Sequence, residues 1–137
     1  MTKDTGVAIH SDALLGKRVL LAIAGGIAAV ESVRLARELR RHQADLTVIM
    51  SEEATKIITP LAVSWGSDTI VHQGWSSEMS QLEAFDLILI APATRNTISK
   101  HLHGIMDSPL LMALSASRGR KSKLCFVPSM HTDLFDD

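Results

Sequence analysis

Cysteine is almost absent from this sequence, which contains a single one, Cys125, among 137 residues. One thiol cannot form a disulfide framework within the chain, nor a metal site built from cysteines. The neighbouring stretch from Leu124 to Val127 is apolar. We therefore expect Cys125 to be a buried, inert thiol and not a nucleophile.

The sequence also lacks an excess of charge and any long hydrophobic run. Its formal net charge is −1 at pH 7, which gives no electrostatic reason to expect nucleic acid or an anionic membrane as a partner. No apolar stretch approaches the roughly 20 residues of a membrane span, and Met1 to Asp12 lacks the apolar region of a signal peptide. We predict a cytoplasmic protein that does not associate with membranes.

The length and composition are those of one globular domain. Hydrophobic residues make up 46% and charged residues 21% of the chain, an ordinary mixture for a protein with a proper core. Residues 1–16 are predicted to be a flexible N-terminal arm, and residues 17–137 the folded domain.

The strongest structural pattern is a strand, a glycine turn and a helix. The run from Val19 to Ala24 carries no charge, as in a strand covered on both faces in the middle of a parallel sheet. Gly25 and Gly26 end it, and a helical pattern follows from Ile27 to His42. Such a turn lets a phosphate approach the backbone at a helix start, but a tight turn that binds nothing explains the glycines equally well.

One side of this predicted helix is apolar. It is formed by Ile27, Val30, Val33, Leu35, Ala36 and Leu39.

A second strand is predicted from Asp45 to Met50, ending at Ser51. This serine is well placed to cap a helix that runs to about Ser64, with a kink near Pro60. Its hydroxyl could also bind a phosphate at the end of the strand. From its position alone we prefer the capping role.

Further elements follow the same alternation. A short strand is possible at Thr69 to Val71, and the apolar run from Asp86 to Ala91 predicts another central strand. Pro92 ends that strand, and a helix to about Leu102 follows. A last helix and strand are predicted over residues 109–117 and 123–127.

This alternation predicts an α/β fold, a doubly wound parallel sheet in three α/β/α layers of the flavodoxin-like or Rossmann-like kind. Ligands of such sheets bind beyond the carboxyl ends of the strands. The ends here are Gly25-Gly26, Ser51, Ala93 to Thr97, and Ser129 to His131. Their convergence favours a ligand that carries a phosphate.

Several segments resemble one known family in order and spacing, the homo-oligomeric flavin-containing cysteine decarboxylases of the phosphopantothenoylcysteine decarboxylase type. The block from Ala91 to Thr97 is the most specific of them. The segments that carry the resemblance are Gly25 to Ala29, Met50 to Thr55, Thr59 to Leu61, Ala91 to Lys100, His103 to Ile105 with Asp107, and Pro128 to His131.

The resemblance implies a protein that binds FMN, usually as a trimer, and oxidises the cysteine thiol of a small-molecule or peptide substrate so that carbon dioxide is lost. It places Ser129 near the flavin ring. The residues that it implies for the phosphate side of FMN are Gly25, Gly26, Ile27, Ser51, Thr94, Arg95, Asn96 and Thr97.

Three departures from the family affect the chemistry. The stretch from Met79 to Phe85, where the family has its catalytic histidine, contains none. His131 stands where the family has an asparagine that binds the substrate carboxylate, so it is a candidate for substrate binding and a weak candidate for catalysis. Family members also continue past the position of Asp137. The alternative function is therefore a flavin-binding relative without catalysis.

A metal site is not expected. His101 and His103 are two residues apart near a helix end, and this spacing does not put both on one helical face.

Overall fold

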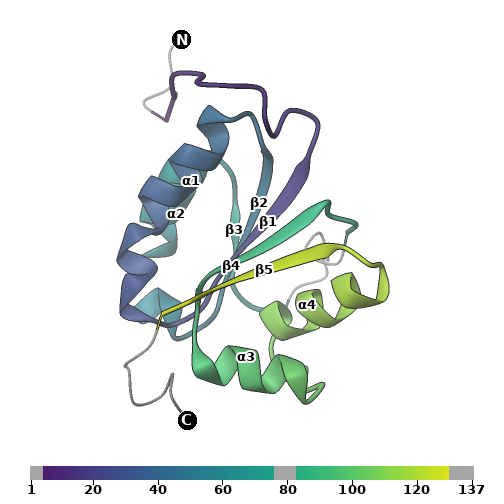
Figure 1. The fold of residues 1–137 in the computed structure, drawn as a ribbon. Coiled ribbons are helices and arrows are strands. Elements are labelled where there is room, and N and C mark those ends of the chain that lie inside the picture. Colours follow the sequence, from purple (N-terminus) through teal and green to yellow (C-terminus); the bar gives the residue numbers. More distant parts are fainter. Residues whose placement is uncertain (1–4, 76–82, 130–137) are drawn as a thin grey trace.

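The computed structural model describes residues 5–75 and 83–129, and its centre is a five-stranded parallel sheet (Figure 1). The strand order is β3-β2-β1-β4-β5, so β1 lies in the middle and the chain winds outward from it in both directions. This is the predicted doubly wound sheet. The strands are β1 (Arg18–Ile23), β2 (Asp45–Met50), β3 (Val71–His72), β4 (Leu87–Ala93) and β5 (Lys123–Pro128).

Helices cover both faces of the sheet, which confirms the predicted three layers (Figure 1). On one face lie α1 (Ser32–Arg41) and α2 (Pro60–Ser67), preceded by the short 3-10 turns η1 (Ile27–Glu31) and η2 (Ala54–Lys56). On the other face lie α3 (Arg95–Leu102) and α4 (Pro109–Gly119).

The alternation of side chains along β1 builds the two cores. Val19, Leu21 and Ile23 face the α1 and α2 layer, whereas Leu20 and Ala22 face α3 and α4. All five are fully buried, at 0% exposure. A charged side chain at any of them would lose its hydration without gaining a partner, which explains the uncharged run.

The α1 and α2 helices approach each other at a glycine. A Cβ atom on Gly66 would lie 2.8 Å from Cγ1 of Val33, so no larger residue fits without a shift of one helix. The Gly66 carbonyl also accepts a hydrogen bond of 2.9 Å from Arg40.

Two predicted helices differ in detail from the structure. The segment after β1 begins as the 3-10 turn η1, and the α-helix starts only at Ser32. A 3-10 turn has three residues per turn, so it rotates side chains away from the face that an α-helical period predicts. Ile27 and Val30, which we expected on the apolar side, are 77% and 51% exposed.

The helix predicted from Ser51 to about Ser64 is also divided. Ser51 does cap a turn, because its Oγ accepts a hydrogen bond of 3.2 Å from the Ala54 N–H, but η2 ends at Lys56. A new helix then begins at Pro60, where Thr59 Oγ1 accepts from the Ala62 N–H at 3.1 Å. Proline lacks the N–H that a continuous helix needs and suits a first turn instead.

The prediction of a buried Cys125 is wrong, since this thiol is exposed. It lies on β5, which forms the edge of the sheet. Leu124 and Phe126 pack toward α3 and α4, while Cys125 and Val127 point to the opposite face. The run from Leu124 to Val127 is therefore apolar on both faces of β5, although helices cover only one of these faces.

Residues 5–16 contain no helix or strand and run past the end of α1. The His10 N–H donates to the Arg41 carbonyl at 2.9 Å, and the Leu14 N–H donates to the His42 carbonyl at 2.9 Å. The Ser11 hydroxyl lies 2.6 Å from Nδ1 of His42. The flexibility of the arm stays a prediction.

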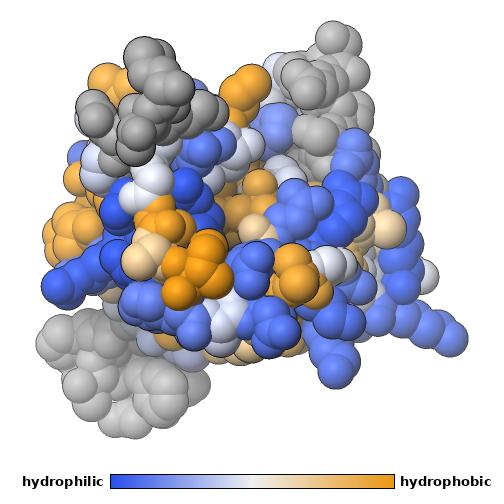
Figure 2. Space-filling model, turned by 90° about the horizontal axis from the view of Figure 1, so that it is seen from above, coloured by the Kyte–Doolittle hydropathy of each residue, from blue (hydrophilic) through white to orange (hydrophobic). Residues whose placement is uncertain are grey.

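Apolar side chains at the surface are scattered. On the face that Figure 2 shows, hydrophobic residues form small groups separated by hydrophilic ones. Within the described residues, no helix has both the length and the apolar character that a membrane crossing requires.

His101 of α3 is buried at 4% exposure, with its ring 5.7 Å from that of Phe126. Among the described residues, nothing forms a hydrogen bond with its Nδ1. Burial lowers the pKa of His101 below its ordinary value, and the positive charge of Arg118 lowers it further. A lowered pKa of a base means that the folded protein resists protonation at this ring.

We therefore expect the free energy of unfolding to fall as the pH drops below the ordinary histidine pKa of 6.5. Below that pH the His101 ring binds a proton in the unfolded chain more readily than in the folded chain, so acid favours unfolding. Urea denaturation at about pH 7.5 and about pH 5.5 measures the loss. His101→Gln should lose less stability over this interval than the unchanged protein. An equal loss in both would contradict the claim that His101 causes it.

Candidate functional site

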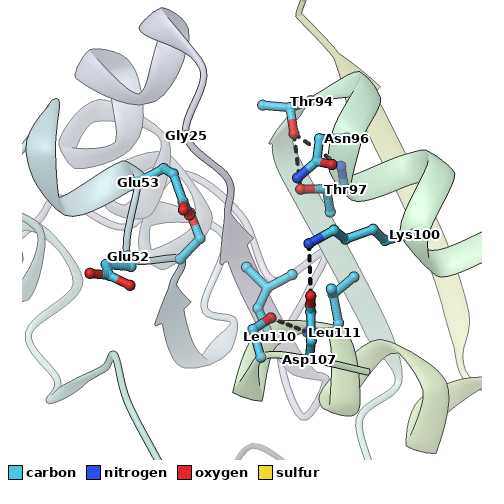
Figure 3. Close-up of a pocket in the computed structure, with 12 residues that line it drawn as sticks. Gly25, Glu52, Glu53, Thr94, Asn96, Thr97, Lys100, Asp107, Leu110 and Leu111 are labelled. Atoms are coloured by element: carbon cyan, nitrogen blue, oxygen red, sulfur yellow. Dashed lines mark hydrogen bonds and ion pairs between the residues drawn. The ribbon is translucent and has the colours of Figure 1, made fainter. Parts of the chain in front are cut away.

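A cavity of about 460 Å³ lies beyond the carboxyl ends of β1, β2 and β4 (Figure 3). The loops that follow these three strands supply most of its lining, and the start of α4 closes one side. The lining residues are Gly25, Ser51, Glu52, Glu53, Thr94, Asn96, Thr97, Lys100, Asp107, Ser108, Leu110 and Leu111. Its place at the centre of a doubly wound sheet is where such folds bind ligands.

Gly25 lets the turn after β1 lie against the turn after β2. A Cβ atom at this position would overlap the Cβ of Glu53 and lie 3.1 Å from its carbonyl carbon. At Gly26 a Cβ would make only ordinary contacts, the nearest at 3.5 Å from Pro92 Cγ. The close approach of the two turns therefore requires glycine at position 25, whereas position 26 has room for a Cβ atom.

Hydroxyl groups on this rim serve as helix and turn caps. Ser51 Oγ accepts from the Ala54 N–H, and Thr94 Oγ1 accepts from the Thr97 N–H at 3.2 Å. The Thr94 hydroxyl in turn donates to Oγ1 of Thr97 at 2.9 Å. The Ser51 and Thr97 hydroxyls keep a hydrogen that can be donated to a ligand.

The first turn of α3 adds further polar groups. Asn96 is exposed and lines the cavity together with Thr94 and Thr97, across from Glu53 (Figure 3). The unpaired backbone N–H groups of a helix start carry a partial positive charge, which favours an anion such as phosphate.

Charged side chains in the cavity were not among the predicted site residues. Lys100 on α3 and Asp107 before α4 form an ion pair of 2.8 Å that joins two segments of the lining. Glu52 and Glu53 add two carboxylates. Lys100 is the only lysine or arginine that the described lining contains, so the charged groups of the cavity are mainly acidic.

The structure brings five of the nine predicted cofactor residues into this lining. They are Gly25, Ser51, Thr94, Asn96 and Thr97.

The other predicted residues lie outside the lining. Gly26 is next to Gly25, and its neighbour Ile27 is exposed. Arg95 begins α3, and Ser129 follows β5, where its N–H donates to the Ala93 carbonyl at 3.1 Å. His131 falls outside the described residues, as does most of the stretch in which the family histidine was expected.

Across residues 5–75 and 83–129, no three histidine, cysteine, aspartate or glutamate side chains lie close enough together to hold a metal ion.

The chain belongs to the flavoprotein family, because the family model described as Flavoprotein matches residues 7–137. This confirms the family that the sequence motifs resemble.

The curated relatives include bifunctional coenzyme A biosynthesis proteins named CoaBC. The protein of Thermococcus kodakarensis is 40% identical over 136 residues, covering 94% of this chain and 34% of the relative. That of Methanocaldococcus jannaschii is 35% identical over 129 residues, covering 92% of this chain and 32% of the relative. The chain thus spans about a third of the length of these relatives.

Solved structures with the same fold include an FMN-dependent cysteine decarboxylase and a PPC decarboxylase. The FMN-dependent cysteine decarboxylase SpaF has a TM-score of 0.82 at 22% identity, covering 91% of this chain and 75% of SpaF. A PPC decarboxylase mutant complexed with pantothenoylaminoethenethiol has a TM-score of 0.73 at 21% identity, covering 88% and 71%. These likenesses confirm the flavodoxin-like fold.

Proposed function

We propose that this chain binds FMN in the cavity at the carboxyl ends of β1, β2 and β4. The observation that carries the proposal is the convergence of a glycine turn, a strand-end serine and the polar start of α3 on one cavity of about 460 Å³. That volume lies within the roughly 300–1,000 Å³ of ordinary ligand pockets. The family membership and the FMN-dependent neighbour SpaF support the same cofactor.

The donor set suits the phosphate end of FMN. Ser51, Asn96 and Thr97 offer side-chain donors, and the start of α3 offers backbone N–H groups. These residues would hold the phosphate. The resemblance adds Gly26, Ile27 and Arg95 to them and implies a place near the flavin ring for Ser129. When bound, FMN supplies a two-electron oxidant for a thiol.

The proposed reaction class is the oxidative decarboxylation of a cysteine-ended substrate, either a small molecule or a peptide. Its support is that the relatives are coenzyme A biosynthesis proteins, and that one neighbour, EpiD, is complexed with a substrate peptide. We propose His131 as a substrate-binding residue, on the resemblance alone. A cytoplasmic location is part of this proposal.

A second candidate function is flavin binding without catalysis. It is favoured by the absence of histidine from residues 79–85, where the family has its catalytic base. A positioned base contributes about 10²–10⁴-fold to a rate, so its loss would leave a binding protein with little activity.

The active form is proposed to be a homo-oligomer, most simply a trimer. Trp65 and Trp75 are 43% and 56% exposed, which offers apolar surface for subunit contacts. The apolar residues of the segment from Leu110 to Leu114 add no such surface. Leu110, Leu111 and Leu114 are buried within the chain itself, at 5% exposure or less. Light scattering at micromolar concentration tests the assembly, and a monomer would contradict it.

Gly25→Ala should weaken FMN binding about tenfold or more, because its Cβ displaces the turn of Glu53 at the rim of the cavity. Retained flavin absorbance and FMN titration measure the effect, with Gly119→Ala as a control at a glycine that has open space around it.

Asn96→Ala provides a second variant of this test, because it changes an exposed side chain and should not disturb folding. It should weaken FMN about fivefold through the loss of a donor. Binding that is unchanged in both variants, or no flavin in the unchanged protein after addition of excess FMN, would contradict the proposed site.

We expect the FMN-loaded chain to release carbon dioxide at a rate about 10²-fold or more below that of a family enzyme with its histidine. Anaerobic incubation with phosphopantothenoylcysteine, and separately with a cysteine-ended peptide, measures carbon dioxide and flavin bleaching. Rapid turnover that His131→Ala abolishes would overturn this expectation and make His131 the catalytic residue.

A further inference from the structure

The helix α3 lines the proposed FMN site with one side and packs on the sheet with another. Its buried residues are Thr97 and His101, which lie four positions apart on one face of the helix, and Ile98 adds a partly buried side chain. His101 therefore provides much of the contact between α3 and the sheet. The cavity residues that α3 and its cap supply are Thr94, Asn96, Thr97 and Lys100 (Figure 3).

The surroundings of His101 suit a neutral ring and not a charged one. The residue is 4% exposed, and its ring lies 5.7 Å from the ring of Phe126 on β5. Among the described residues, nothing forms a hydrogen bond with its Nδ1. A protonated ring would lose its hydration here without gaining a partner, so a positive charge on His101 disfavours the packed position of α3.

The described elements that pack against α3 supply no carboxylate to this ring. The only charged residue of α4 is Arg118, and its positive charge opposes protonation of His101. The β4 strand has no ionisable side chain. On β5, Lys123 and Cys125 alternate with Leu124 and Phe126 and so belong to the face that points away from α3.

The ionisable groups of α3 and the loop after it are occupied elsewhere. Lys100 pairs with Asp107 at 2.8 Å, and Nδ1 of the exposed His103 lies 2.8 Å from the Ser99 carbonyl oxygen. Arg95 begins the helix, six positions before His101. Protonation of His101 therefore creates a charge that the described groups around it do not neutralise.

The α3 helix is also short enough to open separately from the rest of the chain. It has eight residues, fewer than a helix needs to be stable by itself, so its helical state depends on its contacts with the sheet and α4. Short elements with few buried contacts open locally while central strands stay folded. An opening confined to α3 would expose His101 to water and to protons.

We propose that protonation of His101 detaches α3 from the sheet, and that the cavity thereby loses its α3 donors in acid. The inference rests on the proposed function in that the cavity holds FMN. The open helix binds a proton at the ordinary histidine pKa of 6.5, whereas the packed helix resists it, so acid favours the open form. Asn96 and Thr97 then leave the phosphate, and FMN is released faster.

Amide hydrogen exchange of the protein without FMN, measured by NMR at about pH 7.5 and about pH 5.5, tests the opening of α3. The amides from Ile98 to His103 should be less protected than those of β1 at both pH values, because α3 opens separately. Their protection, corrected for the intrinsic pH dependence of exchange, should fall about tenfold at the lower pH, because the open form gains about that factor from protonation of one ordinary histidine.

His101→Met removes the titrating group and keeps a buried apolar side chain. In this variant the protection of α3 should fall less than about twofold over the same interval. His101→Gln is a second variant without a titrating ring. His103→Gln is the matched control, an exposed histidine two positions along, and should behave as the unchanged protein. An equal fall in the His101 variants, no fall in the unchanged protein, or α3 amides as protected as those of β1 would overturn the proposal.

The rate of FMN release tests the link between His101 and the site. Loaded protein is diluted at both pH values, and the fluorescence of free flavin gives the dissociation rate. Between about pH 7.5 and about pH 5.5, this rate should rise about tenfold more in the unchanged protein than in His101→Met, in which only the FMN phosphate titrates. An equal rise in both proteins would overturn the link. Absence of FMN binding would contradict the proposed function, whereas the exchange experiment judges His101 without the cofactor.

Discussion

The complete burial of β1 from Val19 to Ile23 is the constraint on which the rest of this structure depends. A strand with neighbours on both edges and helices on both faces can carry no charge, and its residues Val19 to Ile23 are fully buried. Because the chain winds outward from β1 in two directions, the loops that leave β1 and β4 diverge toward opposite layers. The site occupies the crevice between them, as in other doubly wound sheets.

Some side chains that are proposed to bind the ligand also stabilise the fold at this crevice. Ser51, Thr94 and Ser108 each accept a hydrogen bond from a backbone N–H at the start of a turn or helix. Such a cap stabilises a helix by about 1 kcal/mol and holds the hydroxyl in one position. A ligand at the Ser51 hydroxyl would then meet a donor that is already oriented, so little conformational entropy would be lost on binding.

The charge distribution divides the site into two parts with different preferences. The start of α3 presents neutral donors and the positive end of a helix dipole, which suits a phosphate. Toward the end of β2 and the start of α4, Glu52 and Asp107 present carboxylates, and Lys100 is paired with Asp107. The donors that suit an anion and the carboxylates therefore lie in different parts of the same crevice.

The sequence by itself determined the strands, the central place of β1 and β4 in a parallel sheet and five of the residues that line the cavity, because uncharged runs, glycine breaks and capping residues are local signals. Pro92 was expected to end its strand, but β4 continues through it to Ala93. Tertiary structure alone decided the rest. Cys125 is exposed because β5 lies at the sheet edge, and Leu110, Leu111 and Leu114 are buried because α4 covers the β1 and β4 face. Lys100 and Asp107, seven residues apart, meet only because the loop between α3 and α4 folds back over the strand ends. Which residues line the same cavity depends on how turns that are distant in the sequence pack together, and the periodicity of the sequence does not predict that packing.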